Sequence, residues 1–281
     1  MTRLAKITFL LFSAILTTAL MSSCTAKPKT GDSYIVRIVT SKGTMEVELF
    51  NDTPLHRDNF VKLVEDGTYN GLAFHRVIKE FMIQGGDPDT KNMEPGKVYG
   101  GGDLGYTVPA EFVPTHFHRK GALAAARQGD QVNPEKRSSA SQFYIVQGKV
   151  YDEPTLMPML QQTAAQQRSA QAVAVVRKYY QENLQGKTDR NEEALRATLD
   201  SVYDRALDSI PTPPVNPEAV KIYTTEGGVP HLDGEYTVFG QVIKGMEVID
   251  AIAACETDQY DNPKDKVEIV EMTIVRTPKG K

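Results

Sequence analysis

The alternation of apolar and polar residues along this chain predicts a β-rich protein. Two runs, 34–40 (YIVRIVT) and 44–50 (TMEVELF), alternate with a period of two, and the Ser-Lys-Gly between them is typical of a hairpin turn. Further strand patterns occur at 72–84, GALAAAR, SQFYIVQG, TVFGQVI and KVEIVEMTIVRT. We therefore expect a mainly β fold.

Two helices are predicted among these strands. Thr53 can cap the first, Pro54 suits its first position, and Gly67 stands where a C-terminal glycine belongs. The second is the short segment MEVIDAIAAC, which precedes the last strand pattern.

The pattern changes between residues 151 and 226. Helical periodicity replaces alternation in PMLQQTAAQQRSAQAVAVVRKYYQEN and in NEEALRATLDSVYDRALDSI. The proline-rich PTPPVNP that follows excludes both helix and central strand and predicts an extended connector. Residues 151–226 are therefore predicted to be a helical insertion in a β-rich domain.

The first residues have the pattern of an export signal. Arg3 and Lys6 precede the apolar run 7–20, and LMSSC resembles a bacterial lipobox that ends at Cys24. We expect residues 1–23 to be a signal peptide and 24–33 a tether, with Cys24 lipidated and the protein anchored to a bacterial membrane facing the periplasm. Ordinary signal cleavage is the alternative.

Composition and the remaining motifs exclude several kinds of site. The chain has 32 basic and 36 acidic residues and no basic stripe with interleaved aromatics, which argues against nucleic-acid binding. The stretch VYGGGDLGYTVPAEF lacks the Gly-Lys-Ser/Thr ending of a phosphate loop. His116 and His118 form an H-x-H pair without a third ligand at suitable spacing, so we expect no metal and no cofactor.

Three motifs carry a family resemblance. FHRVIKEFMIQGGDP (74–88), then SQFYI, then HLDGEYTVFGQVIKGMEVID occur in the order and at the spacing found in cyclophilin-type peptidyl-prolyl cis-trans isomerases, which this chain resembles over residues 34–150 and 227–277. The resemblance implies a closed eight-stranded antiparallel β-barrel capped by two helices. It also implies that proline-containing polypeptides are the substrates.

The resemblance also implies the roles of individual residues. Arg76 corresponds to the catalytic arginine of the family, whose always-charged donors can bond the proline nitrogen in the twisted transition state. The expected substrate-binding residues are the pocket residues Phe81, Met82 and Leu232, the glutamines Gln84 and Gln142, and the strand edge Ala126 and Arg127.

Three positions depart from the family pattern. Tyr144 replaces a phenylalanine of the pocket, His231 replaces a tryptophan, and Tyr236 replaces a histidine that borders the proline. The tryptophan matters chiefly for cyclosporin affinity in the family. The resemblance therefore implies weak inhibition by cyclosporin with activity retained, and nanomolar inhibition of the purified domain would contradict this.

Two questions stay open from the sequence. The family fold could serve as an enzyme, or as a proline-peptide binding module or holdase chaperone in which turnover is incidental. The insertion at 151–226 must emerge beside the substrate groove, where it could shape access, dock a partner protein, or be a passive elaboration.

Overall fold

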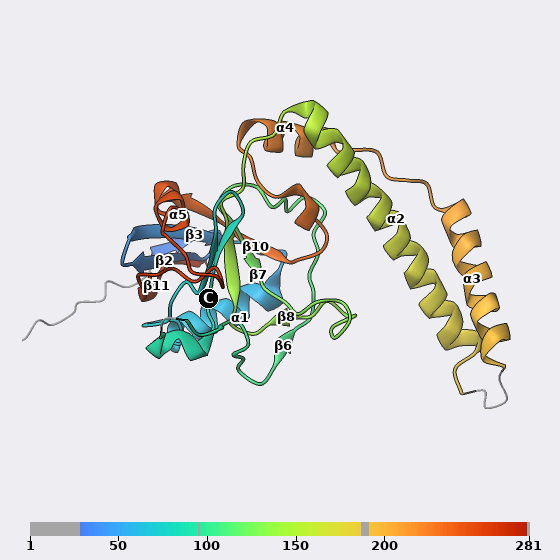
Figure 1. Ribbon diagram of the computed structural model, residues 1–281, viewed down its shortest axis with the longest axis horizontal. Helices are drawn as coiled ribbons and strands as arrows, with labels where there is room; N and C mark the ends of the chain where they lie inside the picture. The colour runs from blue at the N-terminus through green and yellow to red at the C-terminus, as the bar shows by residue number, and fades with distance from the viewer. Residues whose placement is uncertain (1–28, 95, 187–190, 280–281) are drawn as a thin grey trace, which may run out of the picture.

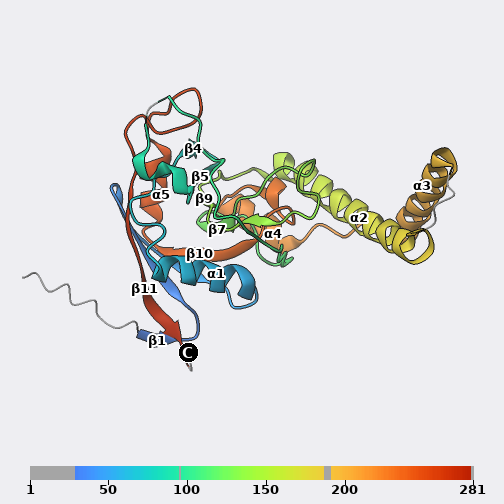
Figure 2. The ribbon, with the colours of Figure 1, turned by 90° about the horizontal axis from the view of Figure 1, so that it is seen from below.

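The computed structural model describes residues 29–94, 96–186 and 191–279, which form one curled β-sheet with helices around it (Figures 1 and 2). The predicted signal peptide and Cys24 lie outside the described residues. No helix in the described ranges has the length and apolar character needed to span a membrane. The strands are β1 (Lys29–Gly31), β2 (Ile35–Thr40), β3 (Gly43–Leu49), β4 (Arg76–Ile78), β5 (Met82–Gly85), β6 (Thr107–Val108), β7 (Ala122–Ala125), β8 (Ser138–Ser139), β9 (Phe143–Val146), β10 (Val238–Lys244) and β11 (Ile269–Pro278).

The main sheet has the strand order β1-β11-β2-β3-β10-β7-β9-β5-β4. All its pairs are antiparallel except β1 with β11, so the end of the predicted tether (24–33) is joined to the sheet. β6 and β8 form a separate two-stranded ribbon. The hairpin predicted from residues 34–50 is confirmed as β2 and β3, which pair from Ile35 with Glu48 to Thr40 with Gly43.

The prediction of a closed eight-stranded barrel is wrong. The main sheet includes nine strands within the described residues, and its order is open, with β1 and β4 at the two ends. Short backbone contacts cross the opening, since Phe74 N–H donates to Val267 O (2.9 Å) and Ile269 N–H donates to Leu72 O (2.8 Å). β4, at one end of the strand order, is only three residues long.

Both predicted helices cover this sheet. The first is α1 (Pro54–Glu65), with Pro54 in its first turn and Gly67 in the left-handed region (φ 67°) just after it. The second is α5 (Met246–Ala253). Phe60 from α1 and Ile249 from α5 belong to the same core cluster, so one core lies between the sheet and both helices. Thr53 makes no side-chain cap, contrary to the prediction.

Among the described residues, three further helices lie in the predicted insertion. They are α2 (Glu153–Asn183), α3 (Glu192–Ser209) and α4 (Pro217–Thr225). At 31 residues, α2 is about 45 Å long, and with α3 it extends away from the sheet in both views (Figures 1 and 2). The start of α2 and all of α4 stay close to the sheet, where Leu156 and Tyr223 pack with Phe117 in a small apolar cluster.

Candidate functional site

The strands beside the site are buried on both faces, and each face packs into a different apolar cluster. On β9, Phe143 and Ile145 point into the main core, while Tyr144 and Val146 belong to a second apolar cluster on the opposite face. This alternation follows from the two-residue period of a strand. We call the second cluster the pocket cluster; its buried members are Met82, Ala122, Ala124, Ala126, Tyr144, Val146, Val229 and Val238.

The predicted proline-pocket residues meet at this cluster. Met82 is a buried member, and Phe81, Leu232 and Tyr236 are partly buried and pack against it. The His231 ring stacks on Phe81, with 6.0 Å between centroids and 16° between the planes. The structure thus brings together side chains from positions 81–82 and 231–236, which are far apart in the chain.

Arg76 lies at the edge of this region, on the first residue of β4. It pairs in register with Gln84 of β5, and its side chain is 44% exposed. Its Nε lies 3.7 Å from the Asp261 carboxylate. The neighbouring Val77 N–H donates to Asp261 O (2.9 Å), so the same residue holds both the backbone of β4 and the guanidinium. The guanidinium therefore keeps donors available to a ligand.

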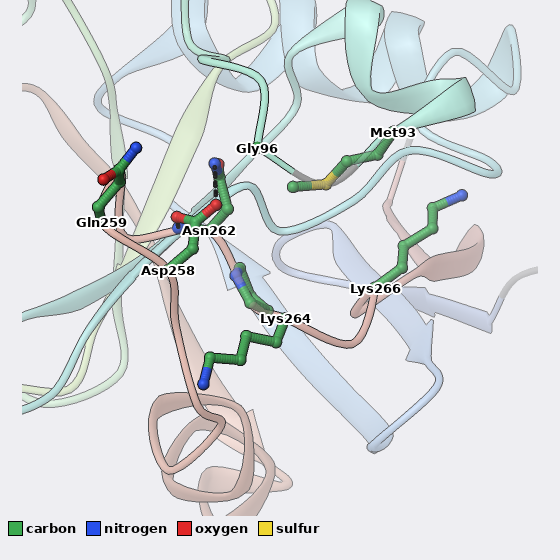
Figure 3. Close-up of a pocket in the computed structure, with 8 residues that line it drawn as sticks. Met93, Gly96, Asp258, Gln259, Asn262, Lys264 and Lys266 are labelled. Atoms are coloured by element: carbon green, nitrogen blue, oxygen red, sulfur yellow. Dashed lines mark hydrogen bonds between the residues drawn. The ribbon is translucent and has the colours of Figure 1, made fainter.

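Asp261 belongs to a tight turn that borders a hollow of about 410 Å³ (Figure 3). Asp261 has a left-handed backbone (φ 62°), and the Asp258 carboxylate accepts hydrogen bonds from the backbone of Tyr260 (2.8 Å) and Asn262 (3.1 Å). Lys264 and Lys266 line the same hollow. Its lining includes no residue of the predicted substrate site, so we interpret this turn as support for Arg76.

Gln84 and Gln142 form a short polar chain next to Arg76. Gln84 Nε2 donates to Gln142 Oε1 (3.2 Å), and Gln142 Nε2 donates to the carbonyls of Gly100 (3.0 Å) and Gly102 (2.8 Å). These residues line a groove of about 540 Å³ that continues to Arg127. The glycine-rich stretch thus serves as a wall of this groove.

The backbone beneath this groove requires a glycine. Gly86 has a left-handed φ of 85°, and a Cβ at this position would overlap the Ser141 carbonyl. The close approach keeps β5 against the segment that leads into β9. Gly86 therefore serves a tight backbone path.

The strand edge at Ala126 differs from expectation. Ala126 N–H already donates to Gln142 O (3.0 Å), and its carbonyl accepts from Ser139 N–H (2.8 Å). Both main-chain groups of Ala126 are therefore used within the chain. A peptide that pairs with this edge would meet the main chain of Arg127 instead.

The Arg127 side chain holds neighbouring loops in place, which is a role that the sequence did not suggest. It is 5% exposed, and it donates to Glu235 O (2.8 Å), Glu235 Oε2 (3.1 Å) and Asp130 Oδ1 (2.6 Å). Its guanidinium also lies 4.6 Å from the centre of the Tyr236 ring. Arg127 thereby ties two loops that border the groove.

The hydroxyl of Tyr144 enters a buried hydrogen-bond network that sequence reasoning missed. It lies 2.9 Å from His118 Nε2, and His118 Nδ1 lies 2.9 Å from Asp233 Oδ1. Because a carboxylate only accepts, Nδ1 carries a proton towards Asp233, and in the neutral ring Nε2 then accepts from Tyr144. The Tyr223 hydroxyl donates to Asp233 Oδ2 (2.7 Å). The network therefore joins the pocket cluster to α4.

Burial keeps both tyrosines of this network protonated. It raises the pKa of Tyr144 well above its usual range, with Tyr236 and Asp233 adding to the effect. Burial also raises the pKa of Tyr223, and the Asp233 carboxylate adds to the effect. Both hydroxyls are therefore hydrogen-bond donors over the physiological pH range. No spacing in the sequence links positions 118, 144, 223 and 233, so only the fold reveals this network.

The H-x-H pair has separate partners. His118 contacts Asp233 and Tyr144, whereas His116 lies 3.2 Å from Asp52 and 3.1 Å from the carbonyl of Val238. Within the described ranges, no group of three histidine, cysteine or acidic side chains is arranged to hold a metal ion.

Comparison with known proteins identifies the relatives of this chain. The family model described as cyclophilin type peptidyl-prolyl cis-trans isomerase/CLD matches residues 35–163 and 216–274. A "Putative peptidyl-prolyl cis-trans isomerase" of Staphylococcus haemolyticus is 30% identical over 240 residues, covering 85% of this chain and 90% of the relative. A protein of Staphylococcus saprophyticus with the same description is 32% identical over 238 residues, covering 83% and 89%.

A solved structure supports the fold. The crystal structure of a cyclophilin type isomerase from Cryptosporidium parvum matches with a TM-score of 0.50 at 22% identity, over 86% of this chain and 97% of that chain. The shared feature is the curled antiparallel sheet with its covering helices.

Proposed function

This chain belongs to the cyclophilin-type peptidyl-prolyl cis-trans isomerase family, and we propose that it acts on Xaa-Pro bonds of exported polypeptides from a lipid anchor at Cys24. Its activity is peptidyl-prolyl cis-trans isomerisation. The single observation that carries the site proposal is the position of Arg76. Arg76 stands opposite Gln84 in the pairing of β4 with β5, two residues along from Met82 of the pocket cluster, and its side chain is 44% exposed.

The barrier to this reaction is electronic. Rotation about a peptide bond costs about 18–20 kcal/mol because the nitrogen lone pair is delocalised into the carbonyl. In the twisted transition state the lone pair returns to nitrogen, so a donor aimed there bonds the transition state better than the planar ground state. The Arg76 guanidinium supplies such a donor. A charged hydrogen bond worth roughly 1.5–3 kcal/mol accelerates exchange by about one to two powers of ten.

The pocket residues supply the remaining stabilisation. The proline ring packs on Met82, Phe81 and Leu232, which removes water from the reacting amide and strengthens the bond from Arg76. Gln84, which donates to Gln142 Oε1 (3.2 Å), holds the substrate backbone in this proposal. No step requires a cofactor or a metal, because the chemistry is rotation about one bond.

The proposal is tested by comparing Arg76→Ala with the wild type in a proline isomerisation assay on a short Xaa-Pro peptide. We expect kcat/KM to fall by about 10- to 100-fold, since one charged donor to the transition state is lost. Arg37→Ala is a matched control, because Arg37 is 46% exposed and also pairs with a carboxylate, Glu46 at 2.9 Å.

The rival function is a proline-peptide binding module or holdase, which needs no transition-state donor. A wild type without turnover that still binds the peptide would favour it. Full activity of Arg76→Ala would exclude Arg76 as the catalytic residue.

The export and anchoring part of the proposal is supported by the sequence. The apolar run 7–20 and the LMSSC motif precede Cys24 directly. The described chain then begins with β1, which joins the sheet beside the end of β11. The clients are accordingly polypeptides that fold outside the cytoplasm, in the periplasm.

A further inference from the structure

A second groove lies between the inserted helices and the sheet domain. It has a volume of about 550 Å³. One side is formed by the segment 112–117 and the loop that contains Tyr236, and the other by α2 and the connector Pro214–Asn216. The family model does not match residues 164–215, which supply much of the second side.

The groove stays open because of the side chains on α2. Leu156 and Leu160 anchor the start of the helix on Phe117 and α4. Farther along, the lining of the groove on α2 includes the short side chains of Thr163, Ala164 and Ala170 beside the longer glutamines at 167 and 171. Alanine and threonine leave space that larger side chains would fill, and α2 leads away from the sheet (Figure 1).

This groove shares a wall with the proline pocket. Tyr236 and Val238 line the groove and also belong to, or pack against, the pocket cluster. The Tyr236 ring lies 5.7 Å from that of Tyr144, which is part of the pocket cluster. An extended chain advances about 3.3 Å per residue, so residues that flank a bound proline can reach past Tyr236 into the groove.

The lining determines what the groove can hold. Its apolar surface includes Phe112, which is 39% exposed, and Val215. Its neutral polar groups include the amides of Gln167, Gln171 and Asn216, which can both donate to and accept from a peptide backbone.

The charged groups of the groove are already engaged. Asp233 accepts from His118 and Tyr223, and His116 faces Asp52 at 3.2 Å. An uncharged apolar ligand therefore suits this groove better than a charged one.

From this continuity and chemistry, we propose that the groove is an extended subsite for the client polypeptide. It binds apolar residues that flank the isomerised Xaa-Pro bond, with the chain in an extended conformation. The inserted helices thereby select clients with apolar sequence around proline, as unfolded polypeptides have. This inference rests on the proposed isomerase function and adds a substrate preference to it.

The test uses the full chain and two peptides with the same central Xaa-Pro bond. One is a tetrapeptide, and the other is a ten-residue peptide with leucine and phenylalanine on both sides of that bond. For the wild type, we expect kcat/KM to be about tenfold higher for the long peptide, because an additional apolar side chain is buried.

Two matched alanines of α2 provide the variants. Ala170→Arg places a long charged side chain in the groove, whereas Ala165→Arg places it on an exposed position of the same helix that does not line the groove. We expect Ala170→Arg to remove the tenfold preference and leave the tetrapeptide rate unchanged. We expect Ala165→Arg to keep both. Phe112→Ser, which removes part of the apolar wall, should act like Ala170→Arg.

The outcomes separate this inference from the function it rests on. No wild-type turnover of the tetrapeptide would overturn the isomerase function itself. Turnover without a preference for the long peptide, or a preference that survives both Ala170→Arg and Phe112→Ser, would overturn the subsite. Sedimentation that shows a dimer dissociated by Ala170→Arg would also overturn it, because a second copy would then occupy the groove.

Discussion

The hydroxyl group of Tyr144 gives this residue a hydrogen-bonding role in addition to its packing role in the pocket. Its ring lines the pocket cluster, as expected from the family resemblance, but its oxygen contacts His118 on the side away from the main core. A phenylalanine could not make this bond. The tyrosine at position 144 is therefore part of one hydrogen-bond network with His118, Asp233 and Tyr223.

We expect Tyr144→Phe to lower the free energy of unfolding by about 1–3 kcal/mol, because it leaves the buried Nε2 of His118 without a partner. Urea unfolding measures this. Tyr106→Phe is the control, since it removes a hydroxyl that donates to Asn59 (2.7 Å) at an exposed position and should cost under about 1 kcal/mol. Equal effects of the two substitutions would contradict the importance of the buried network.

His75 gives the protein a specific pH dependence. It is 1% exposed, and burial lowers its pKa to about 4, against the opposing effects of Asp87 and the backbone of Ala73. Between pH 6.5 and about 4 the unfolded chain therefore binds a proton that the folded chain does not. Above this pH range the contribution of His75 to the free energy of unfolding is fully present, and this contribution is lost as the pH falls through the range.

The expected loss for His75 is about 3 kcal/mol between pH 6.5 and pH 4. Burial lowers the pKa of His56 as well, which acts in the same direction. Urea unfolding at a series of pH values should show the decline, and His75→Gln should make it shallower. If His75→Gln leaves the slope unchanged, protonation of this residue is not its cause.

At the scale of elements, the inserted helices divide into two parts. The start of α2 and all of α4 pack against the sheet domain, and Tyr223 of α4 reaches Asp233. The rest of α2 packs mainly with α3. The family model resumes at residue 216, just before α4, which agrees with this division. The segment that could be removed is therefore shorter than the predicted insertion, 151–226.

We expect a chain that lacks residues 173–208, with Ala172 joined to Ser209 by a short linker, to fold and to keep its activity on a tetrapeptide within about twofold. The two ends are close, since Arg168 donates to the Ile210 carbonyl at 2.7 Å, and loops of this kind cost little to close. Circular dichroism and the isomerisation assay measure the result.

Removal of all of 151–226 is the contrasting variant. It would take away α4 and the Tyr223 hydroxyl, so we expect a marked loss of stability. If both deletions are equally well tolerated, α4 does not support the pocket.

At the scale of the whole molecule, one curled sheet separates two apolar regions. The main core lies on one face with α1 and α5, and the pocket cluster lies on the other face of β5, β7 and β9. Substitutions on one strand can thus alter either the stability of the main core or binding at the pocket cluster, because neighbouring residues belong to different clusters. Arg76 lies on β4, which is one end of the open strand order.

The predicted anchor also belongs to this scale. In cells that express the full chain, we expect Cys24→Ala to move the protein from the membrane fraction to the soluble fraction, because stable anchoring depends on the attached acyl chains. Isomerase activity of the released protein should be unchanged. Retention of Cys24→Ala in the membrane fraction would contradict lipidation as the anchor.

The sequence by itself determined the family, the antiparallel strands and the two covering helices. It could do so because alternation, the helix-end residues Pro54 and Gly67, and the motif at 74–88 are local patterns. The family resemblance assigned roles to Arg76, Phe81, Met82, Leu232 and Tyr236, and the fold brings the last four of these residues to the pocket cluster.

Only the tertiary structure decided the open sheet order, the side-chain contacts of Arg127 and the network from Tyr144 to Tyr223. These features depend on residues that are distant in the chain, such as 118, 144, 223 and 233, and no periodicity relates such positions. The groove beside Tyr236 has the same origin. It exists because small side chains on α2 face a separate segment of the sheet domain, and that pairing is a property of packing in three dimensions.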